Sequence, residues 1–186
     1  MPADVPSPDL ELLLRRIIRE EAGVDVGPLI DDRGFEKVAA HVADAVAKGA
    51  TVTVGGGRVT GEGFDKGYFF APTVLSGCTD DMLCASEETF GPVAPLFRFK
   101  TEADAIRLAN DTEYGLAAYF YARDIGRVWR VAEALEYGIV GINTGIISTE
   151  VAPFGGVKDS GMGREGSRYG LEDYLNVKYA LVGGLA

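Results

Sequence analysis

Histidine and cysteine, the usual nitrogen and sulfur ligands of metals, are scarce in this sequence. It contains one histidine and two cysteines in 186 residues. Cys78 and Cys84 lack the C-x-x-C spacing that zinc sites and dithiol redox centres use, so we interpret them as two small buried apolar residues. His41 lies in a helical repeat with no other ligand type at metal-binding spacing. We therefore predict no metal site, and we expect His41 at a surface or half-buried helix position.

Long apolar runs and basic clusters are absent as well. No stretch approaches the roughly 18 apolar residues that a membrane span requires, and Arg15 and Arg16 interrupt the apolar run near the N-terminus at once. The formal net charge of -10 would repel a nucleic-acid backbone at long range. We therefore expect a cytoplasmic protein with no membrane segment and no nucleic-acid partner.

Two helices are predicted at the N-terminal end of the chain. Ser7 has the position of an N-cap and Pro8 that of the first helical residue, and this helix ends by Gly23. A second helix is predicted from about Asp31 to Lys48. Its apolar face is formed by Phe35, Val38, Ala39, Val42 and Val46.

Two strands and a glycine-rich hairpin are expected next. The segment Thr51 to Val54 alternates with β-branched residues and ends at Gly55-Gly56-Gly57. The chain then returns through a hairpin as far as Gly67, and Tyr68 to Leu75 is predicted as the following strand. Pro72 within this strand favours an edge or bulged position, because proline donates no ladder hydrogen bond.

Strand and helix patterns alternate from Val93 onward. The predicted elements are, in order, the strand Val93 to Phe99, the helix Glu102 to Asn110, the strand Leu116 to Ala122, the helix Ile125 to Tyr137 and the strand Ile139 to Asn143. Crossovers of this length predict parallel, adjacent, right-handed strand pairs that are buried between helical layers. The predicted fold class is therefore α/β, with a three-layer parallel sheet. A helix near Arg164 to Tyr174 and a final strand from Asn176 to Val182 complete the expected order.

The loop from Thr144 to Gly163 is the first candidate site, because ligands of open parallel sheets bind beyond the carboxyl ends of the strands. Phe154 lies between Pro153 and Gly155 and is expected to face a pocket. A loop that only packs, with Phe154 as a core residue, is an equally good interpretation of the residues alone.

The segment Glu87 to Pro92 is the second candidate site, since two carboxylates, an aromatic ring and a Gly-Pro turn precede a buried strand. A carboxylate there could accept hydrogen bonds from sugar hydroxyls, and the ring could lie against a heteroaromatic group. Composition alone favours a solvated acidic turn with Phe90 in the core. The G-x-G-x-x-G pattern from Gly161 to Gly166 follows no apolar strand, so we do not interpret it as a dinucleotide-binding loop.

Four motifs in a fixed order decide between these interpretations. They are Glu87 to Pro92, Asn110 to Leu116, Gly138 to Asn143, and Pro153 to Gly166. Together they resemble the consecutive C-terminal motifs of NAD(P)-dependent aldehyde dehydrogenases, and their spacing is similar to the family's across nearly everything from Val24 to Leu185. The segment Gly145 to Glu150 resembles the succinate-semialdehyde branch.

The resemblance implies roles for four residues. Glu88 matches the glutamate that binds the nicotinamide ribose, and Phe90 matches the aromatic residue beside the nicotinamide ring of NAD or NADP. Phe154 matches an aromatic residue of the aldehyde pocket. Ser148 matches the hydroxyl that helps to hold the distal carboxylate of the substrate.

The resemblance also implies a division of the chain into three parts. Residues 24–175 match part of the catalytic domain, and residues 176–186 match an oligomerisation arm that joins a neighbouring subunit's sheet, which implies a homo-oligomer. Residues 1–23, the predicted N-terminal helix, do not resemble the family.

The resemblance implies that the groups that carry out the family's reaction lie before the position that corresponds to Val24. They are a cysteine nucleophile, a glutamate base, an asparagine amide and a dinucleotide-binding fold. Neither Cys78 nor Cys84 matches the nucleophile. The resemblance thus implies the C-terminal part of an oxidoreductase that converts succinate semialdehyde or a similar aldehyde to the acid. We predict that this chain alone has no catalytic residue and no activity. Cofactor binding by the chain alone stays open, and a complementary N-terminal fragment is an expected partner.

Two other functions are alternatives. A non-catalytic interaction module would use the strand Asn176 to Val182 to associate with itself or with full-length relatives. An independent thiol enzyme would use Cys84, but carboxylates at Glu87 and Glu88 would raise the pKa of that thiol and make it a poor nucleophile.

Overall fold

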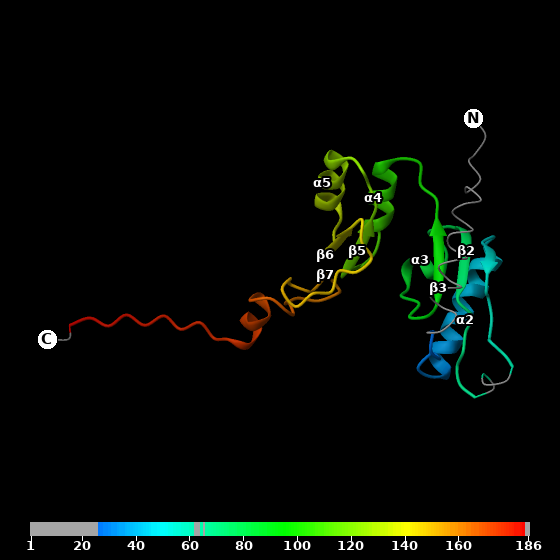
Figure 1. The fold of residues 1–186 in the computed structure, drawn as a ribbon, viewed down its shortest axis with the longest axis horizontal. Helices are drawn as coiled ribbons and strands as arrows, with labels where there is room; N and C mark the ends of the chain where they lie inside the picture. Colours follow the sequence, from blue (N-terminus) through cyan, green and yellow to red (C-terminus); the bar gives the residue numbers. More distant parts are fainter. Residues whose placement is uncertain (1–25, 62–63, 65, 185–186) are drawn as a thin grey trace. The chain divides into compact units, whose positions relative to one another are not determined.

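The structure is a computed structural model that describes residues 26–61, 64 and 66–184 and divides into two compact units (Figure 1). The boundary between the units falls between Arg98 and Phe99. The predicted helix that ends by Gly23 lies outside the described residues. Across the part of the chain that is described, no helix has both the length and the apolar character needed to span a bilayer.

The long helix of the first unit, α2, spans Asp32–Ala47 and forms where the sequence predicted it. Asp31 is its N-cap, because the Asp31 carboxylate accepts a hydrogen bond of 2.8 Å from the Gly34 amide. Apolar residues three and four positions apart give the helix one buried face. The buried apolar side chains on this face are Val38, Val42 and Ala45.

Three strands pair with one another in the first unit. The strand β1 (Thr51–Val54) is antiparallel to β2 (Thr73–Cys78), and β2 is parallel to β3 (Val93–Phe97), which gives the order β1-β2-β3. The strand predicted at Tyr68 to Leu75 in fact starts after Pro72, and it is the central strand rather than an edge strand. Pro72 lies outside the ladders, where its missing amide costs no hydrogen bond.

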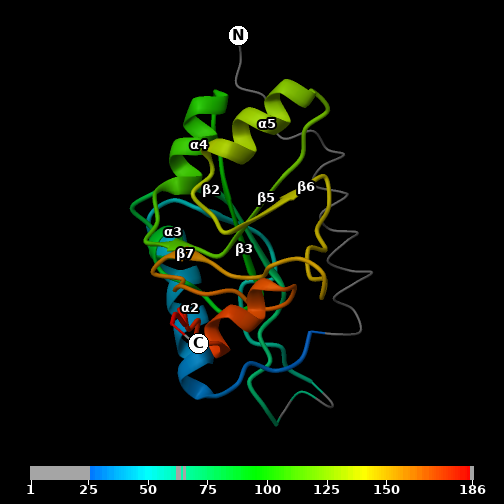
Figure 2. The same ribbon diagram turned by 90° about the vertical axis from the view of Figure 1, so that its left-hand side faces the viewer.

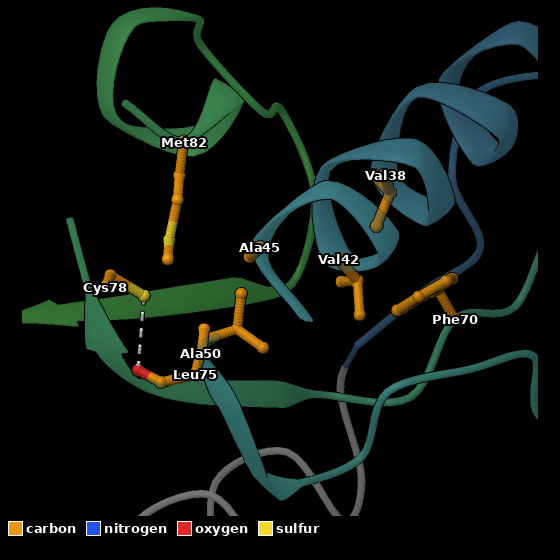
Figure 3. Close-up of a cluster of buried hydrophobic side chains, with 8 residues drawn as sticks. All are labelled: Val38, Val42, Ala45, Ala50, Phe70, Leu75, Cys78 and Met82. Carbon is orange, nitrogen blue, oxygen red and sulfur yellow. Dashed lines mark hydrogen bonds between the residues drawn. The ribbon is translucent and has the colours of Figure 1, made fainter. Parts of the chain in front are cut away.

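The core of the first unit lies between α2, the sheet and the short helix α3 (Leu83–Ser86). Figure 3 shows Met82, at the start of α3, pointing toward the strands. The buried cluster consists of Val38, Val42, Ala45, Ala50, Phe70, Leu75, Cys78 and Met82. The interpretation of Cys78 as a buried apolar residue is confirmed, and Cys84 is partly buried against the same cluster.

The second unit contains the predicted β-α-β arrangement. The elements β5 (Ala117–Phe120), α5 (Ile125–Ala134) and β6 (Ile139–Ile142) follow one another, and β5 and β6 pair in parallel. The helix α4 (Glu102–Asn110), also at its predicted residues, packs beside α5 (Figure 2). In the first unit, β3 pairs in parallel with β2. The expected adjacent pairing is confirmed for β5 and β6, and a pairing of β3 with β5 stays a prediction.

Polar side chains determine where α4 and α5 begin. The Thr101 hydroxyl accepts from the Asp104 amide, and the Asp104 carboxylate accepts from the Thr101 amide, each at 3.1 Å. The Asp124 carboxylate caps α5 by accepting a 2.7 Å hydrogen bond from the Arg127 amide. The Arg127 side chain in turn donates to the Glu102 carboxylate at 2.8 Å, which ties α5 to α4.

The predicted helix of the C-terminal part is wrong in type and extent. The helix expected from Arg164 to Tyr174 is only a 3-10 helix, η1, over Tyr169–Tyr174. Gly163 and Gly166 have φ angles of 88° and 65°, which a right-handed helix does not accommodate. The segment Asn176 to Val182 is exposed throughout and forms no ladder with any described residue. A strand needs a neighbour for its amide and carbonyl groups, and the expected neighbour is the sheet of another subunit, so this strand stays a prediction.

Candidate functional site

The segment Glu87 to Pro92 lies between α3 and β3 in the first unit and presents two side chains. Glu88 is exposed, and Phe90 is 81% exposed. Phe90 has a φ of 49°, a backbone conformation that residues other than glycine rarely adopt. The interpretation with Phe90 in the core is therefore wrong. The chain holds this aromatic ring in the open on a strained backbone, which is typical of ligand-contacting positions.

Contacts with α2 fix this segment in place. The Nδ1 atom of His41 lies 3.0 Å from Thr89 Oγ1, and its Nε2 atom lies 3.3 Å from Glu87 Oε2. Gly91 lies so close to Val38 that a Cβ atom there would overlap the valine side chain. His41 is 1% exposed, so the expected surface or half-buried position is wrong. Helical periodicity cannot reveal this role, because the partners of His41 are 46 and 48 residues away in the sequence.

Glu88 and Phe90 are of the right chemical type for the nicotinamide end of a dinucleotide. An exposed carboxylate can accept hydrogen bonds from both hydroxyls of a ribose. A mostly exposed aromatic ring can lie against a flat heteroaromatic group. Both side chains leave the same short segment, so one ligand can contact the two of them.

The two cysteines of the first unit are poor nucleophiles. Burial raises the pKa of Cys84 to about 11, and the neighbouring Cys78 and, to a smaller degree, the Asp44 carboxylate add to this effect. Burial also raises the pKa of Cys78. The predicted direction of the Cys84 shift is thus confirmed, but its main cause is burial rather than Glu87 and Glu88. Within the described residues, no group of three or more His, Cys, Asp or Glu side chains could hold a metal ion.

The loop that leaves β6 in the second unit carries Ser148 and Phe154. Ser148 is exposed and lies outside any helix or strand, whereas Phe154 is partly buried. The Phe154 amide donates to the Glu165 carbonyl at 2.8 Å, and the Glu165 amide donates back at 2.7 Å. These two hydrogen bonds fix the backbone from which the Phe154 ring extends. The structure defines Ser148 and Phe154 within the second unit and Glu88 and Phe90 within the first.

Two of the four sequence motifs hold each other in place. Two short strands that the sequence did not predict, β4 (Tyr114–Gly115) and β7 (Val157–Lys158), form an antiparallel ladder. The Lys158 ammonium donates to the carbonyls of Asn110 at 2.9 Å and Thr112 at 3.1 Å. The contacts between these two motifs therefore hold the loop after β6 against the end of α4.

Comparison with known proteins identifies the family. The profile of the aldehyde dehydrogenase family matches residues 16–180 of this chain. The chain belongs to the aldehyde dehydrogenase family. The profile match begins at residue 16, whereas the resemblance of the motifs begins later, at Val24. Both positions lie outside the described residues.

Semialdehyde dehydrogenases are among the relatives of this aldehyde dehydrogenase chain. It is 64% identical over 161 residues to the NADP(+) succinate-semialdehyde dehydrogenase GabD of Escherichia coli. The matched residues make up 87% of this chain and 33% of that protein. It is 61% identical over 165 residues to the glutarate-semialdehyde dehydrogenase of Pseudomonas aeruginosa, with 89% of this chain and 33% of that protein covered. The chain therefore spans about a third of the length of the curated relatives it matches.

A solved structure supports the fold. The betaine aldehyde dehydrogenase of Staphylococcus aureus in complex with NAD+ is 39% identical and has a TM-score of 0.81, over 90% of this chain and 35% of that one. Together with the family match, this likeness confirms the expected fold class, an α/β fragment of the aldehyde dehydrogenase type.

Proposed function

We propose that this chain provides the C-terminal third of an NAD(P)-dependent semialdehyde dehydrogenase, which oxidises succinate semialdehyde or a similar aldehyde to the acid. The observation that carries this proposal is the segment at Glu88 and Phe90, where an exposed carboxylate and an exposed ring leave one short turn. Family membership supports the reaction, and relatives named for succinate and glutarate semialdehydes support the substrate class.

Glu88 and Phe90 serve the cofactor in this proposal. The Glu88 carboxylate accepts hydrogen bonds from the hydroxyls of the nicotinamide ribose, and the Phe90 ring lies against the nicotinamide and limits its orientation. When bound, NAD or NADP accepts the hydride that leaves the aldehyde carbon. The nicotinamide ribose is the same in both cofactors, so these two residues do not select between NAD and NADP.

Ser148 and Phe154 serve the aldehyde in this proposal. The Phe154 ring provides an apolar wall for the methylene chain of the substrate. The Ser148 hydroxyl donates a hydrogen bond to the distal carboxylate. A single hydroxyl is a weak partner for a full negative charge, so a cationic side chain from the rest of the enzyme is also needed.

We propose further that the chain is inactive alone, because neither Cys78 nor Cys84 supplies a thiolate near neutral pH. Among the described residues of the second unit, no hydrophobic side chain is fully buried, and the parallel ladder joins the two strands β5 and β6. Sheets of this size need to pack against other elements to be stable, and other parts of the enzyme would provide that cover.

Reconstitution tests the proposal. The chain is mixed with a separately produced N-terminal fragment of a semialdehyde dehydrogenase, and reduction of NAD and of NADP by succinate semialdehyde is followed. We expect no reduction by the chain alone and reduction by the mixture. In the mixture, Glu88→Gln should raise the KM for the cofactor, whereas Glu36→Gln, which changes an exposed carboxylate on α2, should leave it unchanged. No reduction at any ratio, with both pieces folded, would contradict the proposal.

A non-catalytic interaction module is the second candidate function. It is favoured by the exposed apolar side chains of the C-terminal segment, where Val177 is 100%, Tyr179 83% and Leu181 81% exposed. Exposed apolar groups in a row are typical of interaction surfaces. Light scattering at high concentration and a binding assay with a full-length relative test this second function. A chain that stays a monodisperse monomer and does not bind the relative rules the interaction module out.

A further inference from the structure

We propose that His41 is a positioning residue for the cofactor, because it holds the segment that presents Glu88 and Phe90. This inference rests on the cofactor role proposed for those two residues. His41 is the sole histidine of the chain, and it lies on α2, far in sequence from the segment that it contacts.

The first step of the argument is the alternation of side chains along the segment. Glu87 has extended backbone angles, with φ -105° and ψ 138°, and successive side chains of extended backbone point to opposite sides. Glu87 and Thr89 both contact His41. Glu88, between them, is exposed, and from the alternation we infer that its side chain leaves on the side opposite to these two contacts. The two contacts with His41 thus determine the direction in which the Glu88 carboxylate points.

The second step concerns Phe90, whose φ of 49° is unfavourable for a residue with a side chain. Such a conformation persists only where the residues on both sides are held. Thr89 is held by His41, and Gly91 is packed on Val38. His41 and Val38 are three positions apart on α2 and therefore lie on the same helix face. One face of one helix thus holds both sides of the Phe90 backbone.

The third step is the chemistry of the imidazole ring. His41 is 1% exposed and uses both of its nitrogen atoms, one for each anchor residue. In the neutral ring, Nε2–H donates to the Glu87 carboxylate and Nδ1 accepts from the Thr89 hydroxyl; in the charged ring both nitrogens donate, and the hydroxyl accepts. Both protonation states satisfy the two contacts. No other uncharged side chain offers two nitrogen atoms at opposite edges of a rigid ring.

Three substitutions in the full chain separate the contacts. His41→Leu removes both hydrogen bonds and keeps a side chain of similar volume. His41→Asn keeps a polar atom only near the position of Nδ1, which contacts Thr89. Thr89→Val removes the hydroxyl that contacts Nδ1 and leaves the Glu87 contact in place. Val42→Ala, which also lies on the buried face of α2 and removes methyl groups from the core cluster without changing a hydrogen-bonding group, is the matched control.

Amide hydrogen exchange of the chain is the first measurement. We expect His41→Leu to speed the exchange of residues 87–91 about tenfold relative to the β2 amides, and Thr89→Val to have a smaller effect in the same residues. His41→Asn should restore part of the protection. Val42→Ala should speed exchange across the whole unit without singling out 87–91. Unchanged exchange at 87–91 in both His41→Leu and Thr89→Val would overturn the inference.

Kinetics of the reconstituted enzyme is the second measurement. His41→Leu should raise the KM for NAD or NADP about fivefold or more while the KM for the aldehyde is unchanged, and His41→Asn should fall between. A purely structural role would instead lower kcat, through the fraction assembled, with both KM values unchanged. If exchange at 87–91 responds but Glu88→Gln and Phe90→Ala leave the cofactor KM unaltered, the proposed function fails while the anchoring by His41 stands. If reconstitution yields no activity, the exchange experiment alone decides on the anchoring.

Discussion

Replacing Gly91 with alanine should destabilise the first unit by about 1–3 kcal/mol, the usual effect of forcing an extra group into a packed contact. A Cβ atom at Gly91 would overlap Cγ2 of Val38 and would lie 3.4 Å from Cγ1 of the same residue. Val38 is fully buried. Its β-branched side chain has one strongly preferred rotamer in a helix, so it cannot turn aside at little cost. The φ angle of Gly91 is outside the left-handed region, so the substitution tests the steric contact and not backbone strain.

A double-mutant cycle with Val38→Ala isolates this contact. Val38→Ala removes two buried methyl groups, which costs about 1.6 kcal/mol in transfer free energy and about 2–3 kcal/mol once the cavity is included. In the double variant, the alanine at position 91 occupies part of that cavity. The destabilisation of the double variant should therefore be about 1–2 kcal/mol smaller than the sum of the two single effects.

Urea unfolding, followed at two reporters, measures these free energies. His41 is the sole histidine and reports on the first unit by its imidazole signals, and Trp129 is the sole tryptophan and reports on the second unit. The matched control is Gly57→Ala, because a Cβ there meets no atom within 4 Å. Strict additivity of the two single effects, or a Gly91→Ala variant as stable as the Gly57→Ala control, would refute the packing of the segment on α2.

Three further predictions concern titration and burial. Because burial raises the pKa of Cys84 to about 11, iodoacetamide at pH 8 should alkylate it about 100-fold more slowly than a thiol of pKa 9; rapid stoichiometric labelling of the native chain would contradict this. Hydrogen bonds to Lys48 and to the Leu83 amide lower the pKa of Asp44, and Arg130 and Arg127 lower that of Glu102. Each such carboxylate stabilises the fold at pH values above its ordinary pKa and loses this effect as the pH falls through the lowered pKa. The urea concentration at the unfolding midpoint should therefore decrease when the pH falls below about 4. Asp44→Asn should make that decrease smaller. Leu75→Ala should cost about 2–5 kcal/mol by calorimetry, since Leu75 is 0% exposed; a loss below about 1 kcal/mol would place it outside the core.

Local patterns in the sequence were sufficient for several elements. Apolar spacing located α2 to within one residue at each end, and the predicted bounds of α4 match the observed ones. The β5-α5-β6 arrangement followed from the length of the crossover, since a parallel pair needs a helix between its strands. These features depend on interactions within one element or between neighbours in sequence, which a sequence pattern records directly.

Other features depended on contacts between residues that are far apart in sequence. The histidine on α2 looked like an ordinary helix position until the fold brought Glu87 and Thr89 against it. The strand expected from Asn176 to Val182 also depends on a distant partner edge, which the sequence assigns to a neighbouring subunit and which none of the described residues supplies. Glycines with positive φ limited the expected helix at Arg164 to a short 3-10 turn.

Motifs and periodicity are properties of the chain itself, so the family, the α/β class and the residues proposed for cofactor and aldehyde could be predicted from the sequence. Only the tertiary structure decided which side chains hold those residues in position. It showed that Phe90 is exposed rather than buried and that His41 is buried rather than exposed. Burial is decided by what packs against a residue: another segment of the chain covers His41, whereas the Phe90 ring is left 81% exposed.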